Sequence, residues 1–251
     1  GAVTNSGLSS SAPLDAFQSV IEKYPALGAG DEIRVDTGEF DLGRTVYLNQ
    51  QNSGSSGSPL VIRGSSSGAA IFNRLDQSED TFLFDGVSHV RFERLNFTRG
   101  AAGLRVAGTG LNPSVGIVIA DCQSYSNSLV GMVISTCSNL LVKGCSSWRN
   151  SGDGFSLSAS DSTVTNNFAG WNSGSGLGFG GYGLVSANHC ASNSVTGLGA
   201  SRNALMTLVV SSNQLDHNGG VGLWVGGGDY DEVGAQVVGN TSYANSGAGL
   251  V

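Results

Sequence analysis

An asparagine that is followed four residues later by a glycine recurs six times in the second half of this 251-residue chain. Intervals of 21 to 27 residues separate the six asparagines, which are Asn127, Asn150, Asn172, Asn193, Asn218 and Asn245. A repeat of this length indicates a solenoid, in which one supersecondary unit stacks on the next. The repeat constrains the fold more strongly than any local helix or strand preference.

Apolar residues keep a fixed distance from each asparagine. A β-branched residue stands eight positions before every one of them, from Ile119 in the first copy to Val237 in the last. Apolar and small residues alternate after each glycine, and a period of two indicates strands with one buried face. Each repeat is therefore interpreted as three short strands and three turns. We predict an all-β fold, a right-handed single-stranded parallel β-helix, with its hand taken from the rule for parallel crossovers.

The asparagines have a structural explanation in such a fold. Stacked strands lie about 4.8 Å apart, so side-chain amides at one turn of successive coils can hydrogen-bond to each other and to turn backbone. We expect the six asparagines to form a structural ladder. Cys122 and Cys145 share a second column and could form a disulfide, but two stacked, buried thiols are the favoured interpretation. Cys137 and Cys190 occupy other columns and are expected to be free.

Residues 1–11 are small and polar and are expected to be a flexible N-terminus, while residues 12–251 form one β-helix domain. Within that domain we predict a capping α-helix at 12–25 with Ser11 as its cap, irregular first coils at 26–106 and regular coils at 107–251. Early strands are expected at 31–40, 45–48 and 59–63. Val251 falls inside a repeated strand, which favours either a longer native chain or end-to-end contact with another domain or copy.

The charge and hydropathy of the chain limit its partners. A net charge of -7 and a pI near 4.8 argue against nucleic acid as the main ligand. No stretch is long and apolar enough to predict a membrane span.

Four segments together resemble a known group of proteins. The sequences are NSGDGFS at 150–156, GLGFGG at 176–181, GDEIRV at 30–35 and SPLVIRG at 58–64. They are similar to segments of secreted right-handed parallel β-helix proteins of the pectate-lyase-like superfamily, closest to family 9 polysaccharide lyases. The resemblance implies a secreted or cell-surface protein that acts on a polysaccharide, with calcium held by aspartates of the first segment and a catalytic lysine in the second.

The sequence departs from that pattern where the chemistry lies. Only Asp153 remains of the calcium aspartates, and Gly178 stands at the position of the lysine. A uronate eliminase needs a base that removes the proton next to the carboxylate and a cation that stabilises the resulting carbanion. Moreover, the outward positions of the repeated strand carry no titratable group; they are Val133, Ser135, Ser156, Ser158, Gly178, Gly180, Gly199, Ser201, Trp224 and Gly226. We therefore expect a carbohydrate-interacting β-helix whose catalysis is doubtful.

Aromatic and basic residues supply the candidates for binding. Trp148 and Trp171 lie one coil apart at nearly equivalent turn positions, with Arg149 beside them. Such rings can bind sugar rings, or they can simply cover the edge of a coil. Arg105 should point outward, and with Arg91, Arg94 and Arg99 it could bind a polyanionic sugar, although these arginines could equally solubilise an irregular coil. Trp224 adds an aromatic side chain to the repeated strand.

A carboxylate-rich loop is the weaker candidate for chemistry. Asp229 and Asp231, together with Asp153, could ligate calcium or form a glycoside hydrolase pair, whereas the alternative is a solvated acidic loop. Two further functions remain open: a non-catalytic structural or adhesive solenoid of a larger surface or filament protein, and an active lyase, epimerase or glycoside hydrolase with a rearranged site.

Overall fold

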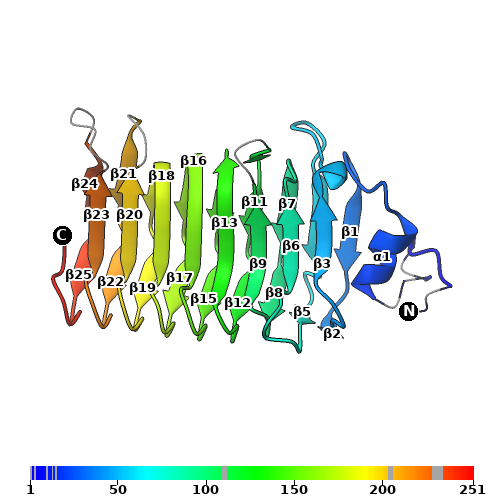
Figure 1. Cartoon of the computed structure of the whole chain (residues 1–251), viewed down its shortest axis with the longest axis horizontal. Coiled ribbons are helices and arrows are strands. Elements are labelled where there is room, and N and C mark those ends of the chain that lie inside the picture. Colours follow the sequence, from blue (N-terminus) through cyan, green and yellow to red (C-terminus); the bar gives the residue numbers. More distant parts are fainter. Residues whose placement is uncertain are drawn as a thin grey trace.

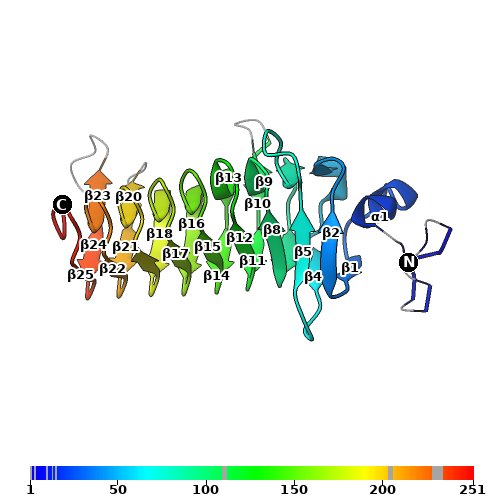
Figure 2. The ribbon, with the colours of Figure 1, turned by 90° about the horizontal axis from the view of Figure 1, so that it is seen from below.

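In the computed structural model the chain winds into parallel coils that follow one another in a single row (Figures 1 and 2). The structure describes residues 2, 4–9, 11, 12, 14, 16–108, 112–202, 206–227 and 234–251. Corresponding strands of successive coils pair in parallel, so that three stacks of strands run the length of the molecule. This is the parallel β-helix predicted from the asparagine repeat.

The first stack contains the strands that follow each repeated glycine. Its members are β3 (Val46–Asn49), β6 (Phe82–Asp85), β9 (Ala102–Ala107), β13 (Val130–Ser138), β16 (Phe155–Thr165), β18 (Leu177–Ser186), β20 (Leu198–Arg202) and β23 (Leu223–Gly227). A two-residue strand, β10 (Ser114–Val115), pairs with the end of β13.

The second stack comes next along each coil. It contains β1 (Glu32–Val35), β4 (Leu60–Gly64), β7 (Val90–Glu93), β11 (Val118–Ala120), β14 (Leu141–Lys143), β21 (Leu208–Ser211) and β24 (Gln236–Val238). The long strands β16 and β18 bend at a register shift and contribute to both stacks.

The third stack is a separate nine-stranded sheet. It contains β2 (Gly38–Asp41), β5 (Ala70–Asn73), β8 (Leu95–Thr98), β12 (Gln123–Tyr125), β15 (Ser146–Trp148), β17 (Phe168–Gly170), β19 (His189–Ala191), β22 (Gln214–Asp216) and β25 (Thr241–Tyr243). The structure thus divides the predicted strand at 31–40 into β1 and β2, because the chain turns a corner between Val35 and Gly38. A 3-10 helix, Gln50–Asn52, follows β3 directly.

The N-terminal helix α1 (Phe17–Lys23) is shorter than the predicted 12–25. Its N-cap is Ala16, whose side chain makes no capping hydrogen bond, so the prediction of Ser11 as the cap was wrong. The helix nevertheless lies against the first coils (Figure 1). Phe17 is buried, and its ring lies 5.4 Å from that of Phe72 and 5.3 Å from that of Phe82. Burial of this aromatic residue covers the end of the apolar core, as predicted.

Two asparagine ladders hold the turns together. In the first ladder, the side-chain Nδ2 of each asparagine donates a hydrogen bond to Oδ1 of the asparagine in the next coil. The distance is 3.0 Å from Asn150 Nδ2 to Asn172 Oδ1 and 2.9 Å from Asn172 Nδ2 to Asn193 Oδ1. The second ladder runs through Asn167, Asn188, Asn213 and Asn240 at the corner between the second and third stacks. The predicted ladder is therefore confirmed, and its amides satisfy buried turn backbone.

The cysteines are free, buried thiols in the structure. Cys145 occupies a ladder position, and its backbone N–H donates to Asn167 Oδ1 at 2.9 Å. Stacked thiols therefore replace asparagines at this corner of two coils, which was the favoured interpretation.

Candidate functional site

The outward face of the first stack is poor in functional groups. Two outward positions in each described central coil carry serine, glycine or valine, as the alternation predicted, and the exposed Thr136 lies at the register shift of β13. A Cβ added to Gly178 would have the backbone oxygen of Phe155 as its nearest neighbour, at 3.7 Å. The fold would therefore accept a lysine at this position, so packing does not explain why glycine is found there.

Two of the candidate arginines, Arg105 on the first stack and Arg91 on the second, are already paired. Arg105 Nε donates to Asp80 Oδ2 at 2.6 Å, and Arg91 Nη2 donates to Glu93 Oε1 at 2.6 Å. Burial raises the pKa of Glu93, but the hydrogen bond from Arg91 and the charge of Arg63 outweigh burial and lower it. The positive charges of Arg91 and Arg105 are thus matched by carboxylates within the protein.

Asp153 has a structural partner. Its Oδ1 accepts the backbone N–H of Ser175, one coil further along, at 2.7 Å. Among the described residues no group of three histidine, cysteine, aspartate or glutamate side chains is placed to hold a metal ion. The other two calcium candidates, Asp229 and Asp231, lie outside the described residues.

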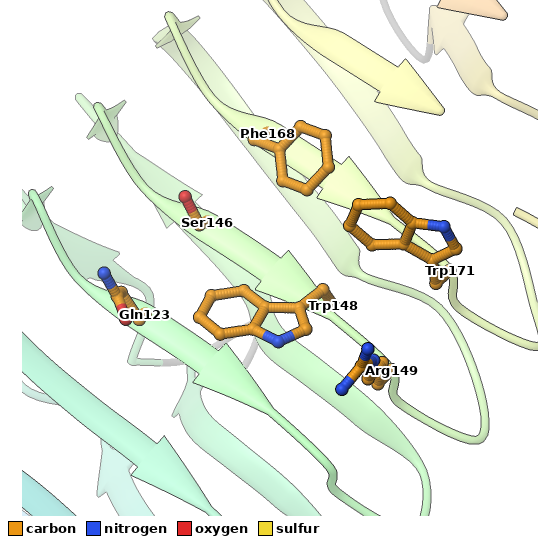
Figure 3. A pocket seen from close by; sticks show the side chains of 6 residues that line it. All are labelled: Gln123, Ser146, Trp148, Arg149, Phe168 and Trp171. Carbon is orange, nitrogen blue, oxygen red and sulfur yellow. The ribbon is translucent and has the colours of Figure 1, made fainter. Parts of the chain in front are cut away.

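The third stack instead carries a shallow, open hollow of about 400 Å³. We call it the aromatic hollow, and it is lined by Gln123, Ser146, Trp148, Arg149, Phe168 and Trp171. Figure 3 shows these side chains arising from three neighbouring strands, β12, β15 and β17, and from the turns that follow β15 and β17. The structure brings together three of the predicted binding residues, Trp148, Arg149 and Trp171. Arg105 and Trp224 belong to the first stack instead.

Strand register sets the arrangement of the rings. Trp148 is paired with Tyr125 on one side, and their rings stack with centroids 4.7 Å apart and planes at 11°. On the other side its partner is Gly170. A Cβ at Gly170 would lie 2.5 Å from Phe168 Cζ, so the glycine leaves the space that the Phe168 ring occupies. The rings of Phe168 and Trp171 then lie 5.6 Å apart at 59°.

The two tryptophans are offset from each other by one position along the coil, in line with the expected near equivalence. Trp148 ends β15, whereas Trp171 follows β17 and corresponds to Arg149 in the coil before. Arg149 and Trp171 both adopt left-handed backbone angles, with φ of 54° and 55°, at the residue before a ladder asparagine. The turn thereby places both side chains at the rim, where Trp171 is 57% exposed. The arrangement offers aromatic faces beside a guanidinium that forms no salt bridge among the described residues.

Sequence reasoning missed Phe168, Gln123 and Ser146. All three occupy one column, four residues before a ladder asparagine, and face outward. Reading that column as exposed would have found them.

The described part of the chain contains no helix with the length and hydrophobicity that a membrane crossing requires. No curated protein matches the sequence.

Solved structures with a similar fold include three polysaccharide-acting proteins. Pectate lyase Pel9A superposes with a TM-score of 0.64 at 17% identity, over 97% of this chain and 61% of that protein. A rhamnogalacturonan lyase superposes with a TM-score of 0.58 at 15% identity, over 98% of this chain and 86% of that protein. The A-module of the mannuronan C-5 epimerase AlgE4 of Azotobacter vinelandii superposes with a TM-score of 0.52 at 18% identity, over 86% of this chain and 70% of that module. This chain therefore spans less than two thirds of the length of the pectate lyase.

The family model described as "right handed beta helix region" matches residues 58–242. These residues include coils of all three stacks, the whole second asparagine ladder and the first ladder as far as Asn218. The chain belongs to the right-handed β-helix family.

Proposed function

We propose that this protein is an extracellular carbohydrate-binding β-helix that holds an acidic polysaccharide on the outer face of its third stack. The observation that carries the proposal is the aromatic hollow, where the rings of Trp148, Phe168 and Trp171 lie beside Arg149. The similar folds of a pectate lyase, a rhamnogalacturonan lyase and a mannuronan epimerase support a carbohydrate ligand.

The spacing of the rings suits a polysaccharide that lies along the helix axis. Successive coils are separated by about 4.8 Å, which is close to the length of one pyranose unit. Trp148 and Phe168 come from neighbouring coils, so each can contact a neighbouring sugar. The apolar C–H faces of pyranoses pack on aromatic rings, whose partly exposed faces provide the contact area.

The charge around the hollow favours an acidic ligand. The protein has a net charge of -7, yet the Arg149 guanidinium at the rim forms no salt bridge among the described residues. Arg99 occupies the corresponding position two coils earlier, and both side chains are exposed. A guanidinium can hold a carboxylate through two parallel hydrogen bonds. A uronate or sulfated sugar would supply such a group.

Binding can be tested by isothermal calorimetry with polygalacturonate, alginate and neutral dextran. Each ring contact contributes about 0.5–1.5 kcal/mol, so we expect the Trp148→Ala, Trp171→Ala double variant to bind about tenfold more weakly. Trp224→Ala is the matched control, because Trp224 is an exposed tryptophan on the first stack. The proposal fails if no polymer binds, or if only the Trp224 variant loses affinity.

Catalysis is tested separately by following the absorbance of unsaturated products with and without calcium. The two outward positions of each central first-stack coil, from Val133 to Ser201, carry no titratable side chain, so we expect no product. Calcium-dependent product would instead favour an active lyase with a rearranged site. A lack of binding to every polymer, together with end-to-end association of the protein, would favour a structural or adhesive role.

A further inference from the structure

Two histidines share one buried aspartate beside the aromatic hollow. Asp216, at the end of β22, is 7% exposed. Its Oδ1 lies 2.6 Å from His189 Nε2, and its Oδ2 lies 3.0 Å from His217 Nδ1. Gln214 Nε2 also donates to Asp216 Oδ1, at 3.1 Å. An ionised carboxylate only accepts hydrogen bonds, so each imidazole presents an N–H to it and keeps its second nitrogen free to take up a proton.

This group of residues continues the surface of the hollow. His189 is the register partner of Phe168, and the two rings meet edge to face with centroids 5.5 Å apart. His217 follows β22 at the position that corresponds to Arg149 and Trp171, with φ of 57°. Tyr243 of β25 packs against the ring of His217 at 5.9 Å and accepts a hydrogen bond from Gln214 at 3.2 Å. Aromatic and imidazole rings therefore line this face from β12 to β25.

The net charge of the group depends on the two imidazoles. With both neutral, Asp216 gives the group a charge of −1, and with both protonated the charge is +1. Imidazole is the side chain that ordinarily changes charge between pH 5 and 8.

The carboxyl group of Asp216 and the thiol of Cys190, which lie beside the histidines, keep their charge in that range. Burial raises the pKa of Asp216, but hydrogen bonds from His217, His189 and Gln214 outweigh it and lower the pKa. Among the described residues, Tyr243 and, beneath the strand, Cys190 are the other titratable groups beside the histidines. Burial raises the pKa of Cys190, so that thiol stays neutral.

We propose that His189 and His217 form a second anion subsite on the third stack, which strengthens the binding of an acidic polysaccharide as the pH falls from 8 to 5.5. The inference rests on the proposed function, because it assigns the histidines to the same extended ligand that the aromatic hollow holds. Arg149 supplies a permanent positive charge, and each imidazole adds one in its protonated form. The protein would thus release an acidic polymer more readily in an alkaline medium than in an acidic one.

The test uses dextran sulfate, because its sulfate esters remain ionised across this pH range, and dextran as the uncharged control. Dissociation constants are measured by calorimetry at pH 5.5 and pH 8.0 for the wild type and for the His189→Gln, His217→Gln double variant. Both side chains are partly exposed, at 41% and 60%, so the substitutions leave the core unchanged. Glutamine preserves a hydrogen-bond donor to Asp216 and cannot take up a proton.

We expect the wild type to bind dextran sulfate about fivefold more tightly at pH 5.5, since an exposed charge pair at contact distance contributes on that order in water. The double variant should bind with equal affinity at the two pH values. An equal pH dependence in both proteins, with binding still lost in the Trp148→Ala, Trp171→Ala variant, would overturn the inference alone. No binding by the wild type at either pH, to dextran sulfate or to polygalacturonate, would overturn the proposed function as well.

Discussion

At the scale of single residues, this protein relies on buried amides that bond to each other and to the backbone. Asn172 illustrates the arrangement, since its Nδ2 donates to Ser147 O at 3.1 Å and to Asn193 Oδ1 at 2.9 Å. Its Oδ1 accepts from the backbone and side chain of Asn150. One side chain therefore connects three coils, which explains why the asparagine recurs although it has no chemical role.

Replacing Asn172 with alanine should destabilise the fold strongly. The substitution leaves several buried polar groups without partners, and we expect a loss of about 2–4 kcal/mol in the free energy of unfolding. Urea denaturation followed by circular dichroism measures the change. Asn96→Ala, at a partly exposed asparagine of β8 outside the ladders, is the control and should change stability by less than about 1 kcal/mol. Equal effects of the two substitutions would argue against the ladder as a stabilising feature.

The buried thiols should be inert in the folded protein. Burial raises the pKa of Cys137 to about 11, and it raises the pKa of Cys122 well above its usual value. Thiolate is the reactive form, so a disulfide reagent at pH 8 should modify none of the four cysteines until denaturant is added. Rapid modification of the native protein would show that the coils open at these corners.

At the scale of elements, the aromatic hollow depends on how three short strands pair. The register of β12, β15 and β17 stacks Trp148 on Tyr125 and places Gly170 beside it. Gly170 carries no side chain, so the ring of Phe168, two residues earlier in the same strand, occupies the space above it. The turn after each strand then directs Arg149 and Trp171 to the rim. The site is thus a product of strand register and turn geometry.

Substituting Gly170 with alanine tests this dependence. The new Cβ would lie 2.5 Å from Phe168 Cζ and would displace the ring. We expect polygalacturonate binding to weaken several-fold and stability to fall by about 1 kcal/mol, as small overpacked substitutions do. Gly178→Ala on the first stack is the matched control, since its Cβ has no neighbour closer than 3.7 Å. If both variants bind like the wild type, the position of the Phe168 ring does not matter for binding.

The pairing of β22 with β19 makes the last coils sensitive to acid. The pKa of Asp216 is lowered in the folded protein, so the carboxylate stabilises the fold above its unfolded pKa, about 3.9. That contribution is lost as the pH falls through the folded pKa. Urea unfolding at pH 7, 5 and 3 should therefore show a decline toward pH 3 that is smaller in Asp216→Asn. An identical decline in both proteins would show that other carboxylates cause the acid instability.

At the scale of the whole molecule, one surface carries recognition groups and another does not. The outward positions of the central first-stack coils, from Val133 to Ser201, carry no charge, while the described part of the third stack presents aromatic and imidazole rings from β12 to β25, with Arg149 at the turn after β15. Arg91 and Arg105 form ion pairs that stabilise the first coils. Arg149 forms no salt bridge among the described residues and is available to a ligand.

Much of this arrangement could be predicted from the sequence, because a solenoid repeats its environment. Positions at a fixed distance from each asparagine predicted the coils, the ladder, the buried thiols and the lack of titratable groups on the outward face of the repeated strand. Local features escaped that reasoning. The pairing of Arg105 with Asp80 joins coils that lack the asparagine repeat, and the helix α1 is set by packing of Phe17 on the core. The position of the Phe168 ring depends on Gly170, two residues later in the same strand, which leaves the space that the ring occupies.

The most direct test of the account is a crystal structure of the protein with a hexameric oligogalacturonate. We predict sugar density along the third stack, with pyranose rings over Trp148, Phe168 and Trp171 and a carboxylate at Arg149. Density over Gly178 and Trp224 on the first stack, with none at the aromatic hollow, would contradict the account.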